Sequence, residues 1–347
     1  MKIALVTDAW HPQVNGVVRT LTAVTGELLR RGHTVAVIAP DQFRSIPAPS
    51  YPEIRLAMAG PNAVAKRLED LAADSIHIAT EGPLGWAARA YCLRRAIPFT
   101  TAYHTQFPDY LARRTGLPAS LFWPLIRKFH QPATRIMVAT ETVREELREN
   151  GLTHLHHWSR GVDTKTFNPA HAPLDLFLEL PRPIQLYVGR MAVEKNLEAF
   201  LGNEHPGAKV VVGDGPALAK LQARFPDAIF LGKRSGRELA ACYAAADVFV
   251  FPSKTDTFGL VMIEALACGT PVAAFPVAGP RDILQPGSGA MAERLEDAIA
   301  QALTFDRATC HAHGRAFSWE ASADQFLDGL EPIAAPAAAS QTAPLAA

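Results

Sequence analysis

The sequence has few cysteines, no net charge and no long apolar run. Its four cysteines, Cys92, Cys242, Cys268 and Cys310, lie far apart without metal or redox spacing, so reduced thiols in a cytosolic protein are the simplest account. The formal net charge is zero, which gives no global signature of nucleic-acid binding, and we expect no nucleic-acid partner. No uninterrupted apolar run reaches about 18 residues, so no membrane-spanning helix is predicted.

Two common ligand motifs are also missing. No Gly-x-Gly-x-x-Gly follows a predicted strand, so we expect no nicotinamide or flavin site. No Asp-x-Asp pair is present to hold a divalent metal ion. The first residues carry one positive charge and only four apolar side chains before Asp8, which is typical of a first β-strand rather than a signal peptide. These absences favour a cytoplasmic protein without a redox cofactor.

The sequence does contain a regular alternation of short apolar runs and helical patterns. Its apolar content of 48% and charged content of 20% describe a globular chain with ample core, and 347 residues favour two domains. Prolines cluster between Pro169 and Pro183, which predicts an inter-domain linker. The apolar runs on either side predict buried parallel strands of an α/β fold, at residues 3–6, 34–39, 75–79, 98–102 and 135–139 and again at 184–188, 209–212, 228–231, 248–251 and 271–275.

The stretch 251–264 leaves a predicted strand, turns and enters a predicted helix near Gly259, with Asp256 in the turn and Glu264 within the helix. A helix start offers unpaired N–H groups to an anion, and from Gly259 to Glu264 the helix rises roughly 7–8 Å, about the separation of the two sugars across a diphosphate. We expect Asp256 to bind the hydroxyls of a donor sugar and Glu264 the ribose. The phosphates would lie against four backbone positions, Thr257, Phe258, Gly259 and Leu260. The alternative is a capped helix with one exposed and one buried acid, which we favour for Asp256 alone but not for the whole stretch.

The loop after the predicted strand 184–188 contains Gly189, Arg190 and Lys195. Two cations on a strand-to-helix loop could clamp a diphosphate and stabilise it as a leaving group without a metal. The alternative is a surface ion pair of Lys195 with Glu194 or Glu198. That alternative does not explain why a glycine and an arginine stand at the end of the strand.

Three further positions lie at the ends of predicted elements. Gly16 stands at the start of a predicted helix, where a phosphate or a sugar could approach, although a plain tight turn explains it equally well. His104 follows the strand 98–102 and should therefore face a cleft beyond the carboxyl ends of the strands. The alternative for His104 is a histidine hydrogen-bonded within its loop. Lys233, in the loop 232–234, could line the rim of a nucleobase site.

Residues 107–130 combine aromatic, apolar and basic side chains. This mixture suits a membrane surface or an amphiphilic substrate, and an internal helical hairpin with a solvated basic face explains it equally well. If the segment binds an amphiphilic substrate that accepts a transferred group, the candidate contacts are Tyr103, Phe107, Tyr110 and Trp123.

The chain resembles the retaining glycosyltransferases of family 4, which have the architecture called GT-B. Two positions depart from the family pattern: its first acid is usually Glu where this chain has Asp256, and its residue before Gly-Val-Asp is usually Asn where this chain has Arg160. The segments that carry the resemblance span nearly the full chain and are specific as a set; they are Asn15-Gly16-Val17, Tyr103-His104-Thr105, Arg160-Gly161-Val162-Asp163, Gly189-Arg190 with Glu194-Lys195-Asn196, Gly213-Asp214-Gly215-Pro216, and the acid-x7-acid spacing of Asp256 and Glu264.

The resemblance implies an α/β fold of two Rossmann-like domains that face each other across a cleft. We expect an acceptor-binding domain at 1–165, a nucleotide-sugar-binding domain at 183–316, and a helix at 317–331 that crosses back to the first domain. The remaining residues, 332–347, are rich in Ala, Pro, Ser and Thr and lack a core-forming pattern, so we expect a disordered tail.

The resemblance also implies an activity: transfer of a hexosyl group from a nucleoside diphosphate sugar, with retention at the anomeric carbon and no obligatory metal. The motifs look most like those of lipid glycosyltransferases, so we favour UDP-glucose or UDP-glucuronate as donor and a membrane-lipid hydroxyl such as that of diacylglycerol as acceptor. The protein would then be cytoplasmic and could bind peripherally to the inner face of the membrane. The implied catalytic residues are His104, which would orient the sugar, and Arg190, Lys195, Asp256 and Glu264.

Several other functions are compatible with the same motifs. A GDP-mannose-dependent α-mannosyltransferase and a polysaccharide glycosyltransferase share the chemistry. A nucleotide-sugar epimerase of the same architecture would need catalytic carboxylates in the first domain and no second substrate. A non-catalytic sugar-nucleotide-binding protein would not need the near-complete set of motifs.

Overall fold

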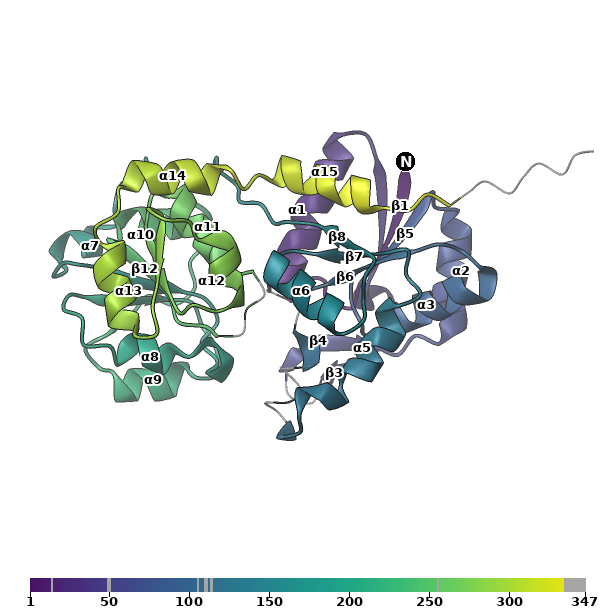
Figure 1. The fold of residues 1–347 in the computed structure, drawn as a ribbon, viewed down its shortest axis with the longest axis horizontal. Coiled ribbons are helices and arrows are strands. Elements are labelled where there is room, and N and C mark those ends of the chain that lie inside the picture. Colours follow the sequence, from purple (N-terminus) through teal and green to yellow (C-terminus); the bar gives the residue numbers. More distant parts are fainter. Residues whose placement is uncertain are drawn as a thin grey trace, which may run out of the picture.

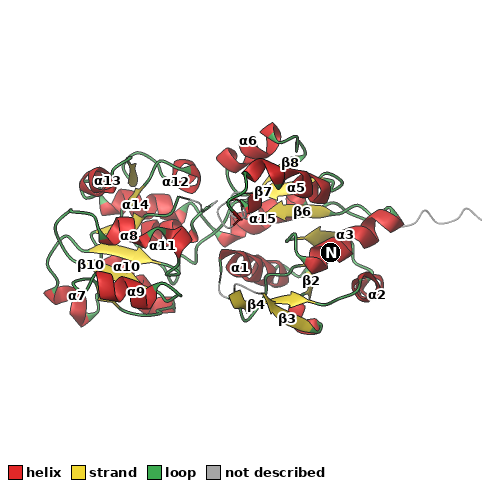
Figure 2. Cartoon of the chain, turned by 90° about the horizontal axis from the view of Figure 1, so that it is seen from below, coloured by secondary structure: helices red, strands yellow, loops and turns green. Residues whose placement is uncertain are grey.

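The structure is a computed structural model that describes residues 1–13, 15–48, 51–104, 106–108, 112, 115–254, 256 and 258–333. Two lobes lie side by side, each built around a six-stranded parallel sheet (Figure 1). Helices lie on both faces of each sheet, as the view turned by 90° shows (Figure 2). The predicted fold class, α/β with two Rossmann-like domains, is confirmed.

The first sheet has the strand order β2-β1-β5-β6-β7-β8. Its core lies on both faces, because the strands carry apolar side chains on both sides, as parallel strands under helices do. The strands are β1 (Lys2–Val6), β2 (Thr34–Ile38), β5 (Ser75–Ile78), β6 (Thr100–Tyr103), β7 (Arg135–Val138) and β8 (Leu155–His157). The helices of this half are α1 (Gly16–Arg30), α2 (Pro61–Leu71), α3 (Pro83–Arg95), α5 (Trp123–His130) and α6 (Glu141–Glu149).

The second sheet has the strand order β11-β10-β9-β12-β13-β14, the order of a Rossmann fold. Every residue of its two central strands, β9 and β12, is buried. The strands are β9 (Gln185–Val188), β10 (Lys209–Val212), β11 (Ile229–Phe230), β12 (Val248–Phe251), β13 (Val272–Ala274) and β14 (Gly289–Met291). The helices are α7 (Asp175–Glu179), α8 (Leu197–Leu201), α9 (Leu218–Arg224), α10 (Gly236–Ala245), α11 (Leu260–Ala267), α12 (Ala278–Ile283), α13 (Leu295–Ala302) and α14 (Arg307–Arg315).

The last helix, α15 (Trp319–Gly329), packs against α1 of the first lobe (Figure 1). Its start is capped by Ser318, whose hydroxyl accepts from the Ala321 N–H at 3.0 Å. The two chain segments that join the lobes are bonded to each other, because the Val162 N–H donates to the Phe317 carbonyl at 3.1 Å. Gly161 is pressed against the same segment: a Cβ built there would lie 2.5 Å from the Trp319 nitrogen.

Two parts of the chain differ from expectation. Two strands that were not predicted, β3 (Ser45–Ala48) and β4 (Tyr51–Ala57), pair with each other in antiparallel orientation. The proline-rich segment contains helix α7, and its Leu174, Phe177 and Leu180 pack against the core of the second sheet. This segment is therefore anchored on the second lobe along much of its length, because its apolar side chains are buried there.

No helix in the described part of the chain is long and apolar enough to cross a membrane.

Candidate functional site

The candidate site begins where the strand order of the second sheet reverses, between β9 and β12. In open parallel sheets the loops that follow these two strands diverge and leave a crevice for a ligand. The loop after β9 carries Gly189, Arg190 and Lys195, and the loop after β12 carries Asp256 and leads into α11. The two predicted groups of donor-binding residues therefore follow the two neighbouring strands that flank the crevice.

Lys195 and Asp256 meet across this crevice. The Lys195 Nζ lies 2.5 Å from the Asp256 Oδ1, and both side chains are three-quarters buried. The next residue ties the same two loops together, because the Asn196 Nδ2 donates to the Pro252 carbonyl at 3.1 Å. The alternative expectation, a surface ion pair of Lys195 with Glu194 or Glu198, is not what the structure shows. Glu198 instead pairs with two other side chains, those of Lys220 and Arg224.

The crevice is also closed from the side of β10. A Cβ built on Gly213 would lie 1.9 Å from the Gly189 carbonyl oxygen, so only glycine lets the loops after β9 and β10 approach this closely. Arg190 lies on the loop after β9, and its backbone carbonyl accepts a hydrogen bond from the buried Tyr187 hydroxyl at 3.0 Å. Burial raises the pKa of Tyr187 well above its ordinary value, and the charges of Asp256 and Glu194 raise it further.

Helix α11 begins at an open end. Its N-cap is Gly259, at φ +84°, and no described side chain accepts a hydrogen bond from its first N–H groups. A Cβ on Gly259 would lie 2.8 Å from the Met262 Cε and 2.9 Å from the Phe251 Cζ, so the site requires glycine. Phe258 is buried and packs edge-on against Phe317, whereas Thr257 lies outside the described residues. Four N–H groups at a helix start attract an anion through their partial positive charge.

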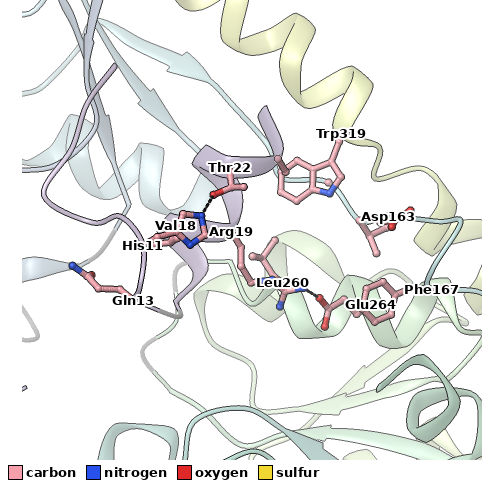
Figure 3. A pocket seen from close by; sticks show the side chains of 13 residues that line it. His11, Gln13, Val18, Arg19, Thr22, Asp163, Phe167, Leu260, Glu264 and Trp319 are labelled. Atoms are coloured by element: carbon pink, nitrogen blue, oxygen red, sulfur yellow. Dashed lines mark hydrogen bonds and ion pairs between the residues drawn. The ribbon is translucent and has the colours of Figure 1, made fainter. Parts of the chain in front are cut away.

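Glu264 lies on α11 and is only 3% exposed. Its Oε2 accepts from the Tyr243 hydroxyl at 3.0 Å, and its Oε1 forms an ion pair with Arg19 of helix α1. Figure 3 shows Arg19 reaching from α1 toward Glu264, at the wall of a cavity of about 320 Å³. The negative charge of Glu264 raises the pKa of Arg19, so the guanidinium is charged at all physiological pH values. The pair joins the two lobes.

Gly16 lies at the start of α1 and faces the start of α11. A Cβ built on Gly16 would lie 3.8 Å from the Cδ1 of Leu260, the first residue of α11. The start of α1 is capped by Asn15, whose Oδ1 accepts from the Val18 N–H at 3.0 Å. The structure therefore brings two helix starts, one from each lobe, to the same place, and both direct positive partial charge toward it.

His104 follows β6 in the first lobe, at the carboxyl edge of the sheet. Its Nδ1 lies 3.0 Å from the Nη2 of Arg160, and its ring stands edge-on to Trp158 with the centroids 5.5 Å apart. Burial, the charge of Arg160 and the neighbouring His77 and His130 hold the pKa of His104 well below its ordinary value. The imidazole is therefore neutral at physiological pH.

The predicted acceptor contacts are placed differently from one another. Tyr103 and Trp123 are both buried in the core of the first lobe, where their rings stack with centroids 6.4 Å apart. Phe107 is half-buried and packs against the same cluster, and Tyr110 lies outside the described residues. Their part in acceptor binding stays a prediction.

Lys233 lies on the loop after β11. Its side chain is largely exposed, and its Nζ lies 3.4 Å from the Asp214 Oδ2. The loop that carries it is held to the Gly-Asp-Gly turn, because the Gly213 N–H donates to the Gly232 carbonyl at 2.9 Å. Lys233 thus borders the crevice through its neighbour Asp214, and a contact with a nucleobase stays a prediction.

Two residues of this site were not predicted from the sequence. Arg19 lies one turn after Gly16. A cation is unfavourable near the start of a helix, so an arginine at this position could have indicated a functional residue. Tyr243 lies in the middle of α10, in an apolar and small-residue context that gives no such signal. Within the described residues, no group of three or more His, Cys, Asp or Glu side chains is arranged to hold a metal ion.

Solved structures with similar folds place this geometry in a class. The sucrose-phosphate synthase of Thermosynechococcus elongatus superposes with a TM-score of 0.74 over 94% of this chain and 97% of its own, at 24% identity. HepE of Anabaena, solved in complex with UDP and glucose, superposes with a TM-score of 0.66 over 94% of this chain and 98% of its own, at 16% identity. These likenesses show the fold, which is the architecture of two Rossmann-like domains called GT-B.

Sequence comparison gives the family. Residues 14–166 match the model of glycosyltransferase family 4, and residues 182–305 match that of the glycosyl transferases group 1. A GDP-mannose-dependent α-mannosyltransferase of Mycobacterium tuberculosis is 32% identical over 96% of this chain and 97% of its own. An α-monoglucosyldiacylglycerol synthase of Streptococcus pneumoniae is 29% identical over 79% of this chain and 71% of its own. The chain belongs to glycosyltransferase family 4, and it is a hexosyltransferase that uses a nucleotide sugar.

Proposed function

We propose that the protein transfers a hexosyl group from a nucleoside diphosphate sugar to a hydroxyl group of a membrane lipid, with retention at the anomeric carbon. The observation that carries this proposal is the crevice of the second lobe. There Lys195, paired with Asp256, lies beside the open start of α11, with the start of α1 facing it from the first lobe. In the proposal the second lobe, from about residue 183 to 316, holds the donor, and the first lobe, residues 1–165, holds the acceptor.

In the proposed reaction the bond between the anomeric carbon and the leaving phosphate oxygen breaks. The acceptor oxygen forms its bond to the same face of the anomeric carbon, and its proton passes to the departing diphosphate. The products are a glycoside and a nucleoside diphosphate. Charge builds up on the diphosphate during this step, so the fixed positive groups of the site lower the barrier most if they contact it. Lys195, Arg190 and the N–H groups at Gly259 have this role in the proposal.

The two acids have separate roles in the proposal. Asp256 would bind hydroxyl groups of the donor sugar, and its ion pair with Lys195 fixes its orientation in the donor-free protein. Glu264 would bind the ribose. A carboxylate has about four acceptor positions, so a ribose hydroxyl can join Arg19 and Tyr243 at this side chain without displacing either.

A lipid acceptor is supported by the outer surface of the segment 107–130. Helix α5 buries Trp123, Ile126 and Phe129, and its opposite side presents an exposed leucine and exposed basic residues. Apolar and basic side chains on one surface are typical of proteins that bind anionic bilayers at the interface. The exposed side chains are Leu117, Leu121, Leu125, Arg127 and Lys128. The relative from Streptococcus pneumoniae, which is named for a lipid product, agrees with this choice.

GDP-mannose is a second candidate donor beside UDP-glucose and UDP-glucuronate. Five relatives at 30–32% identity are named for GDP-mannose, and one of them covers 96% of this chain. The acceptor chemistry and the crevice are the same for either donor. The donors differ in the nucleobase and in the substituents of the sugar ring, so direct competition between donors decides the question.

The test is a panel of UDP- and GDP-hexoses, each incubated with the protein and with diacylglycerol in mixed micelles, followed by mass spectrometry of the lipids. We expect one donor to give a hexosyl lipid and free nucleoside diphosphate, and we expect EDTA to leave the rate unchanged. A new epimer of the donor in the absence of lipid would instead identify an epimerase. Donor binding without turnover on lipid or glycan acceptors would identify a binding protein.

The lipid surface is tested separately by flotation with vesicles. We expect binding to vesicles that contain anionic lipid and weaker binding to neutral ones, and we expect Leu121→Ser with Leu125→Ser to reduce it. The matched control is Leu176→Ser with Leu178→Ser, a pair of equally exposed leucines on α7 of the second lobe. Equal loss of binding in both double variants would contradict a specific membrane surface on the first lobe.

A further inference from the structure

Arg160 is a buried cation with no carboxylate partner among the residues that the structure describes. It follows β8, is 6% exposed, and forms no ion pair with any residue in the described ranges. Its Nη1 donates to the Trp158 carbonyl at 2.7 Å, and its guanidinium carbon lies 4.6 Å above the Trp158 ring. Burial lowers the pKa of Arg160 to about 9, which leaves it charged at neutral pH. Burying a charge without a counter-ion destabilises the folded protein, so we looked for a function of the arginine at this position.

The contact between Arg160 and His104 restricts the protons on the imidazole. Arg160 Nη2 lies 3.0 Å from His104 Nδ1. A guanidinium only donates hydrogen bonds, so the Nδ1 must present its lone pair to it. A doubly protonated ring, or a neutral ring with its proton on Nδ1, would direct an N–H against an N–H. The proton of the neutral ring is therefore on Nε2.

Arg160 is itself held in place by the helix that returns from the second lobe. The Trp158 Nε1 donates to the Ser322 hydroxyl of α15 at 3.1 Å, and that hydroxyl donates to the Ser159 carbonyl at 2.8 Å. The indole is fully buried, so the surface on which the guanidinium stacks is fixed. The chain of contacts runs from α15 through Trp158 and Arg160 to His104.

We propose that Arg160 is a positioning residue that fixes His104 as the neutral Nε2–H tautomer, so that His104 acts on the substrates as a hydrogen-bond donor and not as a base. This inference rests on the proposed function in one respect, namely that His104 contacts the donor sugar or the acceptor. It explains why the acceptor's proton passes to the departing diphosphate: His104 has no basic nitrogen available toward the substrate. It also gives a role to the arginine at position 160.

The proposal is tested on the full-length protein labelled with ¹⁵N in the histidine rings. His104→Gln identifies the His104 signals among those of the twelve histidines. We expect the wild type to show an unprotonated Nδ1 and a protonated Nε2 from pH 6 to 8. In Arg160→Met we expect signals averaged between the two tautomers and a His104 pKa closer to its ordinary value, because the neighbouring donor and cation are gone. Arg160→Gln, whose carboxamide can still donate to Nδ1, should keep the wild-type tautomer.

The kinetic expectation follows from the loss of one aligned hydrogen bond. We expect kcat of Arg160→Met to fall about tenfold with little change in the KM of the donor, and Arg160→Gln to recover most of the loss. The matched control is Arg307→Met. Arg307 is a half-buried arginine that donates to the Ala244 and Ala246 carbonyls and contacts no histidine by hydrogen bond.

The outcomes distinguish the positioning role of Arg160 from the proposed transferase function. Wild-type ring signals in Arg160→Met, or a wild-type protein with the proton on Nδ1, would overturn the positioning role. Averaged tautomers with an unchanged kcat would overturn it as well. A wild-type protein that shows the Nε2–H tautomer and turns over no donor contradicts the proposed function, while the spectrum still supports the fixing of the ring by Arg160.

Discussion

The two lobes have the same kind of sheet, but they treat the crevice at the reversal of strand order in opposite ways. In the first lobe the crevice lies between β1 and β5, and Asp8 fills it. Asp8 accepts from the N–H groups of Leu84 and Gly85 at 2.9 and 3.2 Å and from the Thr80 hydroxyl at 3.0 Å. In the second lobe the crevice lies between β9 and β12, and no described side chain occupies the helix start that faces it.

The same architecture can therefore use a helix start in two ways: capped by a side chain, it stabilises the fold, and uncapped, it can bind a ligand. A helix start attracts negative charge in either lobe. In the first lobe the chain supplies that charge itself. Burial raises the pKa of Asp8, and the hydrogen bonds from Leu84 and Gly85 partly offset that rise. In the second lobe the start of α11 has no side-chain cap among the described residues, and in the proposed function a diphosphate binds there beside Lys195. The following changes test this contrast, from the largest expected effect to the smallest.

Lys195→Ala should have the largest effect, on activity. The variant loses the fixed cation of the open crevice, and we expect kcat/KM to fall about 10²–10³-fold, the cost of removing one group that stabilises charge in the transition state. The measurement is steady-state turnover with the donor that the panel identifies. Lys220→Ala, an exposed lysine of the same lobe, is the control and should leave kcat/KM unchanged. An unchanged rate in Lys195→Ala would remove the crevice from the proposed mechanism.

Asp8→Ala should cost about 2–3 kcal/mol of stability in the first lobe, because two buried N–H groups lose their acceptor. All five tryptophans, residues 10, 86, 123, 158 and 319, lie in this lobe or at the start of α15, so tryptophan fluorescence during urea unfolding follows it. Ser318→Ala removes an exposed cap of α15 and should cost only about 1 kcal/mol. Similar costs for both variants would mean that Asp8 caps α3 no better than a surface residue.

His77 makes the first lobe sensitive to acid. His77 is fully buried, its Nδ1 lies 2.9 Å from the Thr100 hydroxyl, and burial together with the charge of Arg160 lowers its pKa to about 3. The folded protein keeps the ring neutral, whereas the unfolded chain takes up a proton below about pH 6.5. Stability is therefore full above pH 6.5 and falls as the pH drops toward 3. The loss from this one residue is about 2 kcal/mol at pH 5, at 1.36 kcal/mol per pH unit.

The measurement is the free energy of unfolding of the first lobe between pH 7.5 and 5, followed by tryptophan fluorescence. His77→Gln should reduce the slope of the unfolding free energy against pH by about 1.36 kcal/mol per pH unit, the contribution of one proton. Glutamine can hydrogen-bond to Thr100 and does not titrate. His11→Gln, at an exposed position, should leave the slope as it is. A wild-type slope in His77→Gln would mean that His77 does not stay neutral in the folded protein.

The contact between the lobes should give the smallest effect. A double-mutant cycle of Arg19→Met and Glu264→Gln on thermal unfolding should show a coupling of about 1 kcal/mol, because one partner is almost fully buried. The comparison is the exposed pair Arg148–Glu141, for which we expect less than about 0.5 kcal/mol. A coupling no larger than that of the exposed pair would show that Arg19 and Glu264 do not hold the two lobes together.

The sequence was sufficient to predict features that depend on neighbouring strands. Buried parallel strands are recognisable as apolar runs, and the residues after them must meet at the carboxyl edge of the sheet. The expectation that Lys195 and Asp256 lie near one crevice follows from this rule alone. Gly259, at the start of α11, is recognisable because it also follows one of these strands. The two sheets and most helices were predicted on this basis.

Features that depend on contacts between distant segments were not predictable. Arg19 and Glu264 meet only because the two lobes are placed as they are. Helix α14 was missed because its sequence lacks an apolar periodicity; it forms where Gly314 packs closely on α11, a Cβ there lying 2.2 Å from the Ala267 nitrogen. The stacking of Tyr103 on Trp123 in the core of the first lobe was not predictable either, because the two rings come from separate elements, β6 and α5.

Helix α15 has a consequence for how the protein is made. The first lobe is completed by a segment that follows the whole second lobe in the sequence, since Trp158, Ser159 and Arg31 find their partners on α15. Residues 1–165 leave the ribosome without this cover, and the whole second lobe must emerge before it arrives. The contacts of the first lobe with α15 therefore form only after the second lobe has been translated.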